Sequence, residues 1–351
     1  MLREIMTLDQ EVIHFFEGDN IVSSKGSALT ISINDQVKSY QMPRSIMDYI
    51  FPFRLFRRML RLDKCNVFKI GKNFDKFLVI RLGKLYIFDP HLETFDYKFS
   101  LRHCRNVLHN SICETPSGKI IFGEYGANMK LASVPIHFSD DCGQSWKEVD
   151  LFDNGEIKHI HCISYDPYSD DIWVMTGDYE GQCKILVCDQ SFNVKECLGD
   201  GGQDWRTCGV AFEKEFVYWG MDSPLKPSFI VKFSRSARTI EKIHPVDGPV
   251  WYIKSLSDGI TLAGITVEPG ASVQTKSAQI IATTDYKSWH IIAEFEKDKW
   301  SMRWFKYGVL CFADGNQSTE SFAVFGEALK NFDGISRLYS IDKDGPLYDE
   351  G

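Results

Sequence analysis

The chain has 351 residues, of which 44% are hydrophobic and 25% charged, and its formal net charge is −8. This composition gives ample length for a large core, and the acidic balance argues against a general nucleic-acid-binding role, which usually needs a basic excess. No apolar run approaches the roughly 18 residues needed to span a bilayer, and no signal-peptide pattern opens the chain. Ten cysteines are scattered without Cys-x-x-Cys spacing. We therefore expect reduced thiols in a cytoplasmic protein, with no bound metal and no cofactor.

In chain order, the first segments mix strand and helix patterns. Residues 11–40 hold at least two strand-like stretches. Residues 45–61 break the β pattern and predict one short, inserted amphipathic helix, which Pro52 is expected to start or kink. Its basic residues are Arg54, Arg57, Arg58 and Arg61. We favour a helix whose arginines are solvated or paired; contact with a membrane surface or an anionic lipid is the alternative.

The rest of the chain consists of short aromatic and β-branched runs separated by turn residues, as in residues 119–123, 172–176 and 215–219. A repeat runs from about residue 62 to residue 342, and in each copy a second strand ends in an acidic residue. These endings are Asp89, Glu124, Asp178, Asp222, Glu268 and Asp314. The last steps are about 44 to 46 residues long, which is the range of a four-stranded propeller blade.

This pattern predicts an all-β fold, a six- or seven-bladed β-propeller of four-stranded antiparallel blades. We expect residues 1–351 to form a single propeller domain. Residues 11–40 either form a seventh blade or complete the ring with the strand near residues 338–340.

One turn carries a distinctive motif, since residues 139–146 read Ser-Asp-Asp-Cys-Gly-Gln-Ser-Trp. Asp141 can accept hydrogen bonds from backbone N–H groups just downstream, Gly143 supplies a conformation that a side chain resists, and Trp146 can bury its ring under the turn. A degenerate copy, residues 283–289, lies at the same phase of a later unit. We expect both segments to be hairpins between the third and fourth strands of a blade, with a structural role.

The motif resembles the Asp-box of the BNR-repeat, sialidase-like β-propellers. Residues 118–178 are also similar to a bacterial group of these proteins that is labelled glycosidase-like. The resemblance implies a propeller that acts on glycans; exo-sialidases of the family use an arginine triad, a tyrosine with a glutamate partner, and an aspartic acid. The family's early Arg-Ile-Pro motif, which supplies the first triad arginine, is missing from this sequence.

In a propeller the first strand of each blade lines the central channel, so the residues that open these strands are candidate site residues. They are rich in basic and aromatic side chains: Arg105, His159, His161, Trp205, Arg206, Trp251, Tyr252, Arg303 and Trp304. His159 and His161 are two apart on a predicted strand and point to one face, as a general acid/base pair or as two metal ligands. The sequence identifies no third ligand, which ranks acid/base chemistry or substrate contact above a metal.

The remaining candidates divide by chemistry. Arg105, Arg206 and Arg303 suit a carboxylate or phosphate, or else each pairs with a neighbouring acid. Tyr252 is a candidate nucleophile or base. The carboxylates that could act as its partner or as a general acid are Glu124, Asp178 and Glu268. The tryptophans that could stack on sugar rings, or belong to the core, are Trp205, Trp251 and Trp304.

These observations lead to one functional hypothesis with two alternatives. We expect a carbohydrate-active propeller, glycoside hydrolase-like, that acts on an acidic, carboxylate-bearing saccharide in the central funnel. The alternatives are a lyase-type elimination on a uronate, and a non-catalytic propeller that binds a glycan or a protein. No phosphate-binding loop, dinucleotide fingerprint or Gly-x-Ser-x-Gly nucleophile elbow is found in the sequence.

Overall fold

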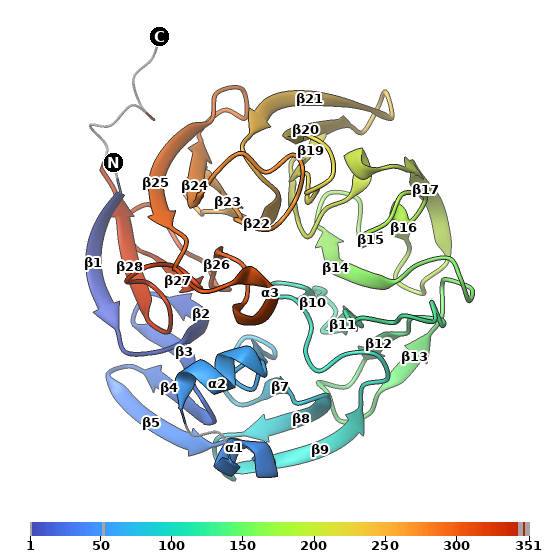
Figure 1. Ribbon diagram of the computed structural model, residues 1–351. Coiled ribbons are helices and arrows are strands. Elements are labelled where there is room, and N and C mark those ends of the chain that lie inside the picture. Colours follow the sequence, from blue (N-terminus) through green and yellow to red (C-terminus); the bar gives the residue numbers. More distant parts are fainter. Residues whose placement is uncertain (1, 51–52, 343–346, 348–351) are drawn as a thin grey trace. The chain divides into compact units, whose positions relative to one another are not determined.

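The structure is a computed structural model that describes residues 2–50, 53–342 and 347. It contains seven four-stranded antiparallel sheets and is a seven-bladed β-propeller (Figure 1). The described residues divide into two compact units, and each is treated separately below. Unit 1 comprises Met1–Asp63 and Glu215–Gly351, and unit 2 comprises Lys64–Lys214.

Unit 2 contains three complete sheets. Their strands are β6 (Cys65–Lys69), β7 (Phe77–Arg81), β8 (Lys84–Asp89) and β9 (Thr94–Ser100); β10 (Ile112–Glu114), β11 (Ile120–Gly123), β12 (Ile136–Ser139) and β13 (Lys147–Val149); and β14 (His159–Asp166), β15 (Asp171–Gly177), β16 (Cys183–Cys188) and β17 (Val194–Gly201). The second strands are almost entirely apolar and buried, as in β7 and β15, so they form the cores of their blades.

Unit 1 also contains three complete sheets. Their strands are β2 (Val12–Glu17), β3 (Asn20–Lys25), β4 (Ala28–Ile33) and β5 (Gln36–Gln41); β22 (Val250–Ser255), β23 (Thr261–Ile265), β24 (Ser277–Thr283) and β25 (His290–Glu296); and β26 (Val309–Phe312), β27 (Phe322–Glu327), β28 (Ser336–Ile341) and β1 (Leu2–Leu8). The seventh sheet contains the boundary between the two units. Its strands are β18 (Val210–Phe212), β19 (Phe216–Gly220), β20 (Ser228–Ser234) and β21 (Thr239–Val246).

The number of blades is settled by the segments near the two termini. Residues 12–41 form a complete blade, β2–β5, as one of the two alternatives predicted. The strand β1 pairs antiparallel with β28, with Leu2 opposite Ile341 and Leu8 opposite Ser336, and so supplies the fourth strand of the last blade (Figure 1). The fold is therefore seven-bladed.

The phase assigned to the repeat is right in the middle of the chain and wrong near its ends. Glu124 and Asp178 follow the second strands β11 and β15, as predicted. Asp89, in contrast, ends the third strand β8, and Asp314 follows the first strand β26. The last blade takes its fourth strand from residues 2–8, so only three of its strands lie in the C-terminal part of the repeat, and the expected four-strand unit does not fit there.

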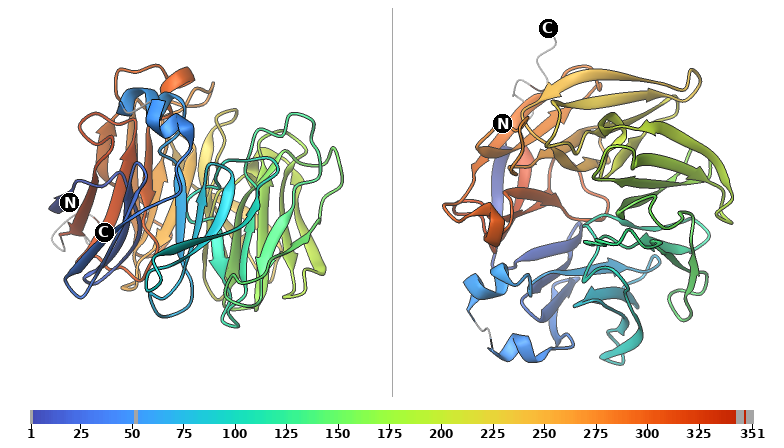
Figure 2. Two further views of the ribbon diagram at one scale, coloured as in Figure 1. Left: turned by 90° about the horizontal axis from the view of Figure 1, so that it is seen from below. Right: turned by 45° about the vertical axis from the view of Figure 1, so that its right-hand side comes forward.

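The predicted helix over residues 45–61 is two helices, α1 (Ile46–Ile50) and α2 (Arg54–Met59). Pro52, and its predicted effect on the helix, lies outside the described residues. A further helix, α3 (Met302–Phe305), lies beside α2 at one end of the unit 1 strands (Figure 2). No helix in the described part of the chain is long and apolar enough to cross a membrane.

Three arginines of α2 make ion pairs within unit 1. The pairs are Arg54 with Glu11 and Asp333, Arg57 with Asp48 and Asp63, and Arg58 with Asp298. The guanidinium of Arg58 is almost completely buried and also donates to the backbone oxygen of Phe305. Pairing within the fold, one of the interpretations of the basic cluster, is observed for these three residues. Arg61 is exposed.

The turn at residues 139–146 joins β12 to β13, the third and fourth strands of their blade, as predicted. The Ser139 hydroxyl donates to Oδ1 of Asp141 over 2.8 Å and accepts the N–H of Gly143 over 2.9 Å. Oδ1 of Asp141 also accepts the N–H of Ser145 over 2.8 Å, and Nε1 of Trp146 donates to the oxygen of Gly143 over 3.1 Å. The motif is thus a closed network of turn hydrogen bonds.

The degenerate copy folds in the same way between β24 and β25, again the third and fourth strands. The hydroxyl of Thr283 accepts the N–H of Tyr286 over 2.9 Å, and Asp285 accepts the N–H of Ser288 over 3.0 Å. Tyr286 adopts a positive φ of 58°, and Trp289 is buried. The shorter copy keeps the hydroxyl and carboxylate hydrogen bonds of the first turn without its glycine, but Nε1 of Trp289 does not reproduce the bond that Trp146 makes.

Replacing Asp141 with alanine is expected to lower the melting temperature at neutral pH. Hydrogen bonds from Ser145, together with one from Ser139, lower the pKa of Asp141 from 3.8 to about 2. A lowered pKa means that the carboxylate stabilises the fold above about pH 4 and that this contribution is lost as the pH falls from about 4 to 2. Melting curves of both proteins from pH 7 to pH 2 should therefore converge at the acidic end.

The control for this experiment is Asp140→Ala in the same turn. Asp140 is exposed, and its ion pairs are with the lysines Lys119 and Lys147, so its loss should change the melting temperature less. Equal effects of the two substitutions would contradict the structural role of Asp141.

Candidate functional site

Four of the predicted site residues gather in unit 2, at one end of the blade β14–β17. His159 and His161 lie on β14, and Asp178 follows β15. His159 is paired with Gly177 across the two strands, which places Asp178 beside both histidines. Arg206 follows the short 3-10 helix η1 (Gln203–Trp205) and reaches the same carboxylate.

A β-bulge shapes this end of β14. The pairing between β14 and β15 shifts between Ile160 and Cys162, so His161 is the extra residue. Bulges re-aim side chains and are frequent beside functional sites. The same shift occurs at His14 in β2 and at Trp251 in β22. The bulge is therefore a feature of the blade repeat, and only the histidine pair is specific to this blade.

The polar atoms of the cluster lie very close together. Nε2 of His159 and Nε2 of His161 are 3.0 Å apart, and Oδ1 of Asp178 lies 3.4 Å from the first and 3.3 Å from the second. Nη2 of Arg206 lies 2.9 Å from the same oxygen, and Nζ of Lys158 pairs with Oδ2. We refer to Lys158, His159, His161, Asp178 and Arg206 as the Asp178 cluster.

Contacts with the backbone fix both imidazole rings. Nδ1 of His159 lies 2.8 Å from the oxygen of Gly126, and Nδ1 of His161 lies 3.1 Å from the oxygen of Thr207. The ring of Tyr125 packs against that of His159 with centroids 4.2 Å apart. The rings therefore cannot turn away from Asp178 without losing these contacts.

The backbone at the carboxylate is also constrained. Asp178 has a φ of 119°, a conformation that non-glycine residues rarely adopt and that is concentrated at functional sites. Its carbonyl accepts hydrogen bonds from Nη1 of Arg206 and Nε2 of Gln203, each over 3.1 Å. A Cβ on the preceding Gly177 would lie 2.8 Å from Cε1 of His161, so only glycine leaves room for the imidazole there.

Burial and charge set the protonation of the cluster. Burial lowers the pKa of His159 below its ordinary value, although the Asp178 carboxylate acts in the opposite direction. Burial raises the pKa of Asp178, but its contacts with His159 and His161 outweigh this and hold it well below its usual range. With Lys158 and Arg206 charged, the cluster holds two positive charges against one carboxylate, an excess that suits an anionic ligand.

The cluster is open to solvent on one side only. His159 and His161 are 2% and 1% exposed, whereas the side chains of Asp178 and Lys158 are 17% and 19% exposed. Tyr179, which is exposed, lies beside Lys158, whose Nζ is 5.3 Å from the ring centroid. A ligand would therefore meet the lysine, the carboxylate and an aromatic face first.

Other predicted residues of unit 2 lie elsewhere. Glu124 is fully buried, and its carboxylate accepts the N–H groups of Arg102 and His103 and contacts Nε2 of His137 at 2.9 Å. These contacts hold its pKa below the usual range although burial raises it. This geometry is that of a structural carboxylate, since Glu124 is fully buried, and the catalytic role stays a prediction.

Arg105 and Trp205 were also predicted to contact the substrate. Arg105 is exposed on the loop before β10. Trp205 lies on η1, not on a first strand, and it packs so closely on Gly199 that a Cβ there would lie 2.5 Å from its ring.

The predicted residues of unit 1 include both core and surface positions. Tyr252 on β22 is 4% exposed and packs within the hydrophobic core of the unit. Trp251 donates from Nε1 to Glu268 over 3.3 Å. The prediction that Arg303 and Trp304 open a first strand is wrong: both are exposed on α3, with the guanidinium 5.4 Å from the indole centroid. Whether these side chains meet those of unit 2 stays a prediction.

Sequence reasoning missed the second cation of the cluster and the groups that orient its rings. Lys158 could have been found, because it directly precedes the His-x-His sequence. The oxygens of Gly126 and Thr207 and the ring of Tyr125 come from separate loops and leave no sequence signal. The role of Gly177 follows only from its distance to His161.

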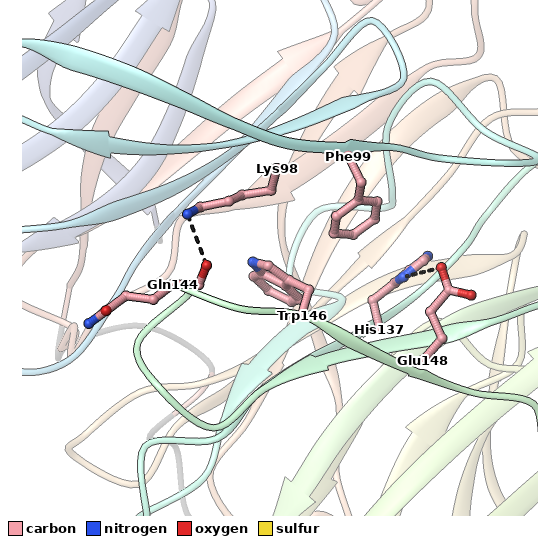
Figure 3. A pocket seen from close by; sticks show the side chains of 6 residues that line it. All are labelled: Lys98, Phe99, His137, Gln144, Trp146 and Glu148. Carbon is pink, nitrogen blue, oxygen red and sulfur yellow. Dashed lines mark hydrogen bonds and ion pairs between the residues drawn. The ribbon is translucent and has the colours of Figure 1, made fainter.

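A small pocket lies in unit 2 beside the turn at residues 139–146 (Figure 3). Its volume is about 330 Å³, and it is lined by Lys98, Phe99, His137, Gln144, Trp146 and Glu148. Nζ of Lys98 donates to the oxygen of Gln144 over 2.9 Å, and Nδ1 of His137 lies 3.5 Å from Glu148. Because His137 also contacts the buried Glu124, this side of the pocket is part of the hydrogen-bond network around Glu124.

The class of protein defined by the fold is the β-propeller, and comparisons with known proteins extend no further. No protein-family model matches the chain, and no curated protein matches it. A chain in the crystal structure of the mitotic checkpoint complex has a TM-score of 0.56 at 9% identity, with 97% of this chain and 93% of that chain covered. A putative TolB from Agrobacterium tumefaciens has a TM-score of 0.44 at 12% identity, with 63% and 78% covered. At these identities the first of these structures shows the fold alone.

Proposed function

We propose that the protein binds an acidic saccharide at the Asp178 cluster and acts on it by acid/base chemistry. The observation that carries the proposal is the convergence of two imidazoles and two cationic side chains on one partly exposed carboxylate. Lys158 and Arg206 suit the carboxylate of a uronate, Tyr179 offers an aromatic face to a sugar ring, and the histidines can move protons. The BNR-type resemblance of the Asp-box turn is in keeping with a glycan ligand and stays a prediction.

Among the reactions considered, a β-elimination fits these groups better than hydrolysis. Hydrolysis by paired carboxylates needs two acids beside the bond, and Glu124 is fully buried in other contacts. Hydrolysis with Tyr252 as nucleophile needs a carboxylate or arginine that activates the phenol, and Tyr252 packs within a hydrophobic core, whereas His159 and His161 contact the partly exposed Asp178. In an elimination, His159 or His161 takes the proton from C5 of the uronate, the C4–O4 bond breaks as the C4–C5 double bond forms, and the leaving oxygen takes up a proton.

The test uses a panel of uronate oligosaccharides, with calorimetric binding and the ultraviolet absorbance of unsaturated uronates as the two readouts. We expect His159→Gln to keep binding and to lower the turnover rate by about 10²- to 10⁴-fold. Lys158→Met should weaken binding by about tenfold, the effect of losing one charge-assisted hydrogen bond. The matched control is Lys130→Met, an exposed lysine of the same unit, and it should change neither readout.

The outcomes separate the alternatives. Binding without turnover in the wild type would favour the non-catalytic propeller. New reducing ends without unsaturated product would favour hydrolysis. Absence of both binding and turnover across the panel would overturn the proposal.

A further inference from the structure

The histidine pair and Asp178 also have the spacing expected of metal ligands. Three potential ligand atoms, Nε2 of His159, Nε2 of His161 and Oδ1 of Asp178, form a nearly equilateral triangle with sides of 3.0, 3.3 and 3.4 Å. A transition-metal ion binds such atoms at about 2.0–2.2 Å, so neighbouring ligands in a tetrahedral or octahedral shell are about 3.0–3.4 Å apart. The spacing of the triangle is that of three ligands on one face of a metal ion.

The hydrogen bonds of the rings turn the correct nitrogens toward this point. Carbonyl oxygens only accept hydrogen bonds, so the contacts with Gly126 and Thr207 place the ring protons on Nδ1 of His159 and of His161. The sulfur of Cys208, 3.4 Å from Nδ1 of His161, is a weaker partner of that same nitrogen. In neutral rings both Nε2 atoms then present lone pairs to each other and to the Asp178 oxygen, an arrangement that either a proton on one Nε2 or a metal ion between the three atoms would relieve.

The surroundings match those of known metal ligands. Metal-binding histidines usually donate their second ring nitrogen to a carbonyl or carboxylate, as both rings do here. The ring of Tyr125 holds the plane of His159. Oδ1 of Asp178 has two lone pairs, one for Arg206 and one for an ion.

We propose that His159, His161 and Asp178 form a binding site for a divalent first-row transition-metal ion. Two imidazoles and one carboxylate favour Zn²⁺, Co²⁺, Fe²⁺ or Mn²⁺ over Ca²⁺ and Mg²⁺, which prefer oxygen ligands alone. Three protein ligands leave further positions open on the ion for water or a ligand carboxylate. The ligands and their tautomers follow from the protein alone. An ion on both Nε2 atoms would occupy the lone pairs that the elimination uses, so the acid/base proposal applies to the metal-free protein.

Two cationic side chains, Lys158 and Arg206, also contact the Asp178 carboxylate that would bind the metal ion. They compete with a dication by charge repulsion and by hydrogen bonding to its ligand. Removing the Lys158 ammonium while keeping all three ligands should therefore tighten metal binding by about tenfold. The same Lys158→Met substitution should weaken saccharide binding, so opposite changes separate the two proposals.

The experiment titrates the chelator-treated full chain with Zn²⁺ by calorimetry and with Co²⁺ by absorption, in the absence of saccharide. We expect one ion per chain and a Co²⁺ spectrum without thiolate charge transfer, which excludes binding by the free cysteines. His159→Gln and His161→Gln should each weaken binding by at least about a hundredfold. The control His91→Gln, an exposed histidine of the same unit, should leave binding unchanged.

Three results would overturn the metal site. The first is the absence of saturable binding to the folded wild type. The second is binding that persists undiminished in both histidine variants. The third is unchanged or weaker Zn²⁺ affinity in Lys158→Met. Because Lys158→Met keeps all three ligands, this result tests the site even if the histidine variants fail to fold.

Discussion

Replacing Asp178 with asparagine is expected to lower the free energy of unfolding by about 3–5 kcal/mol, the largest effect among the predicted site residues. The carboxylate is the shared partner of Lys158 and Arg206, whose side chains are mostly buried. An amide cannot neutralise them, so two cations would remain beside each other in a region with little access to water. The measurement is denaturant unfolding of the wild type and Asp178→Asn, followed by circular dichroism.

The pH dependence gives this prediction a direction that a simple packing defect would not show. Because the pKa of Asp178 is lowered in the fold, its contribution is complete above about pH 4 and is lost as the pH falls below that value. The difference in the free energy of unfolding between the wild type and Asp178→Asn should therefore decrease as the pH falls below about 4. Asp153→Asn is the matched control, an exposed aspartate on the loop before β14, and should change stability little. A gap that stays constant with pH would contradict an electrostatic origin.

Glu124→Gln is expected to lower the free energy of unfolding by about 2–4 kcal/mol, although the change is nearly isosteric. Both oxygens of Glu124 accept hydrogen bonds, from the backbone N–H groups of Arg102 and His103, and His137 contacts one of them. The glutamine amide offers one oxygen and one NH₂ group, so a donor would face a donor in a fully buried site. Denaturant unfolding measures the effect, with the exposed Glu93→Gln in the β8–β9 turn as control.

This substitution also separates a structural role from a catalytic one. A catalytic acid at this position would lose activity and keep its stability when changed to glutamine. A variant with unchanged stability would contradict the assignment of Glu124 to the structural network of β11 and β12.

Sequence reasoning succeeded where the determinants are local. The strands, the hairpin turns at residues 139–146 and 283–289, and the facing pair His159 and His161 depend on residues within a few positions of each other. Asp178 was also found, because it ends the strand that pairs with β14.

The remainder depends on contacts between distant segments. The phase of the last blade could not be read near residue 314, because its fourth strand comes from residues 2–8. For the same reason Arg303 was placed on a strand when it lies on α3. Glu124 and Asp178 occupy equivalent strand ends, and only their partners separate a structural carboxylate from a candidate ligand: His137 for the first, His159 and His161 for the second.

The pairing of β1 with β28 has a consequence for how the protein is made. During synthesis, residues 2–8 are made before their partners at residues 336–341, which follow more than three hundred residues later. Until then β1 is a strand without its neighbour, and afterwards β28 has an open edge until β1 returns to it. Such long-range closure costs loop entropy before it gains contacts, so the last blade is completed only once ribosomal synthesis has passed residue 341.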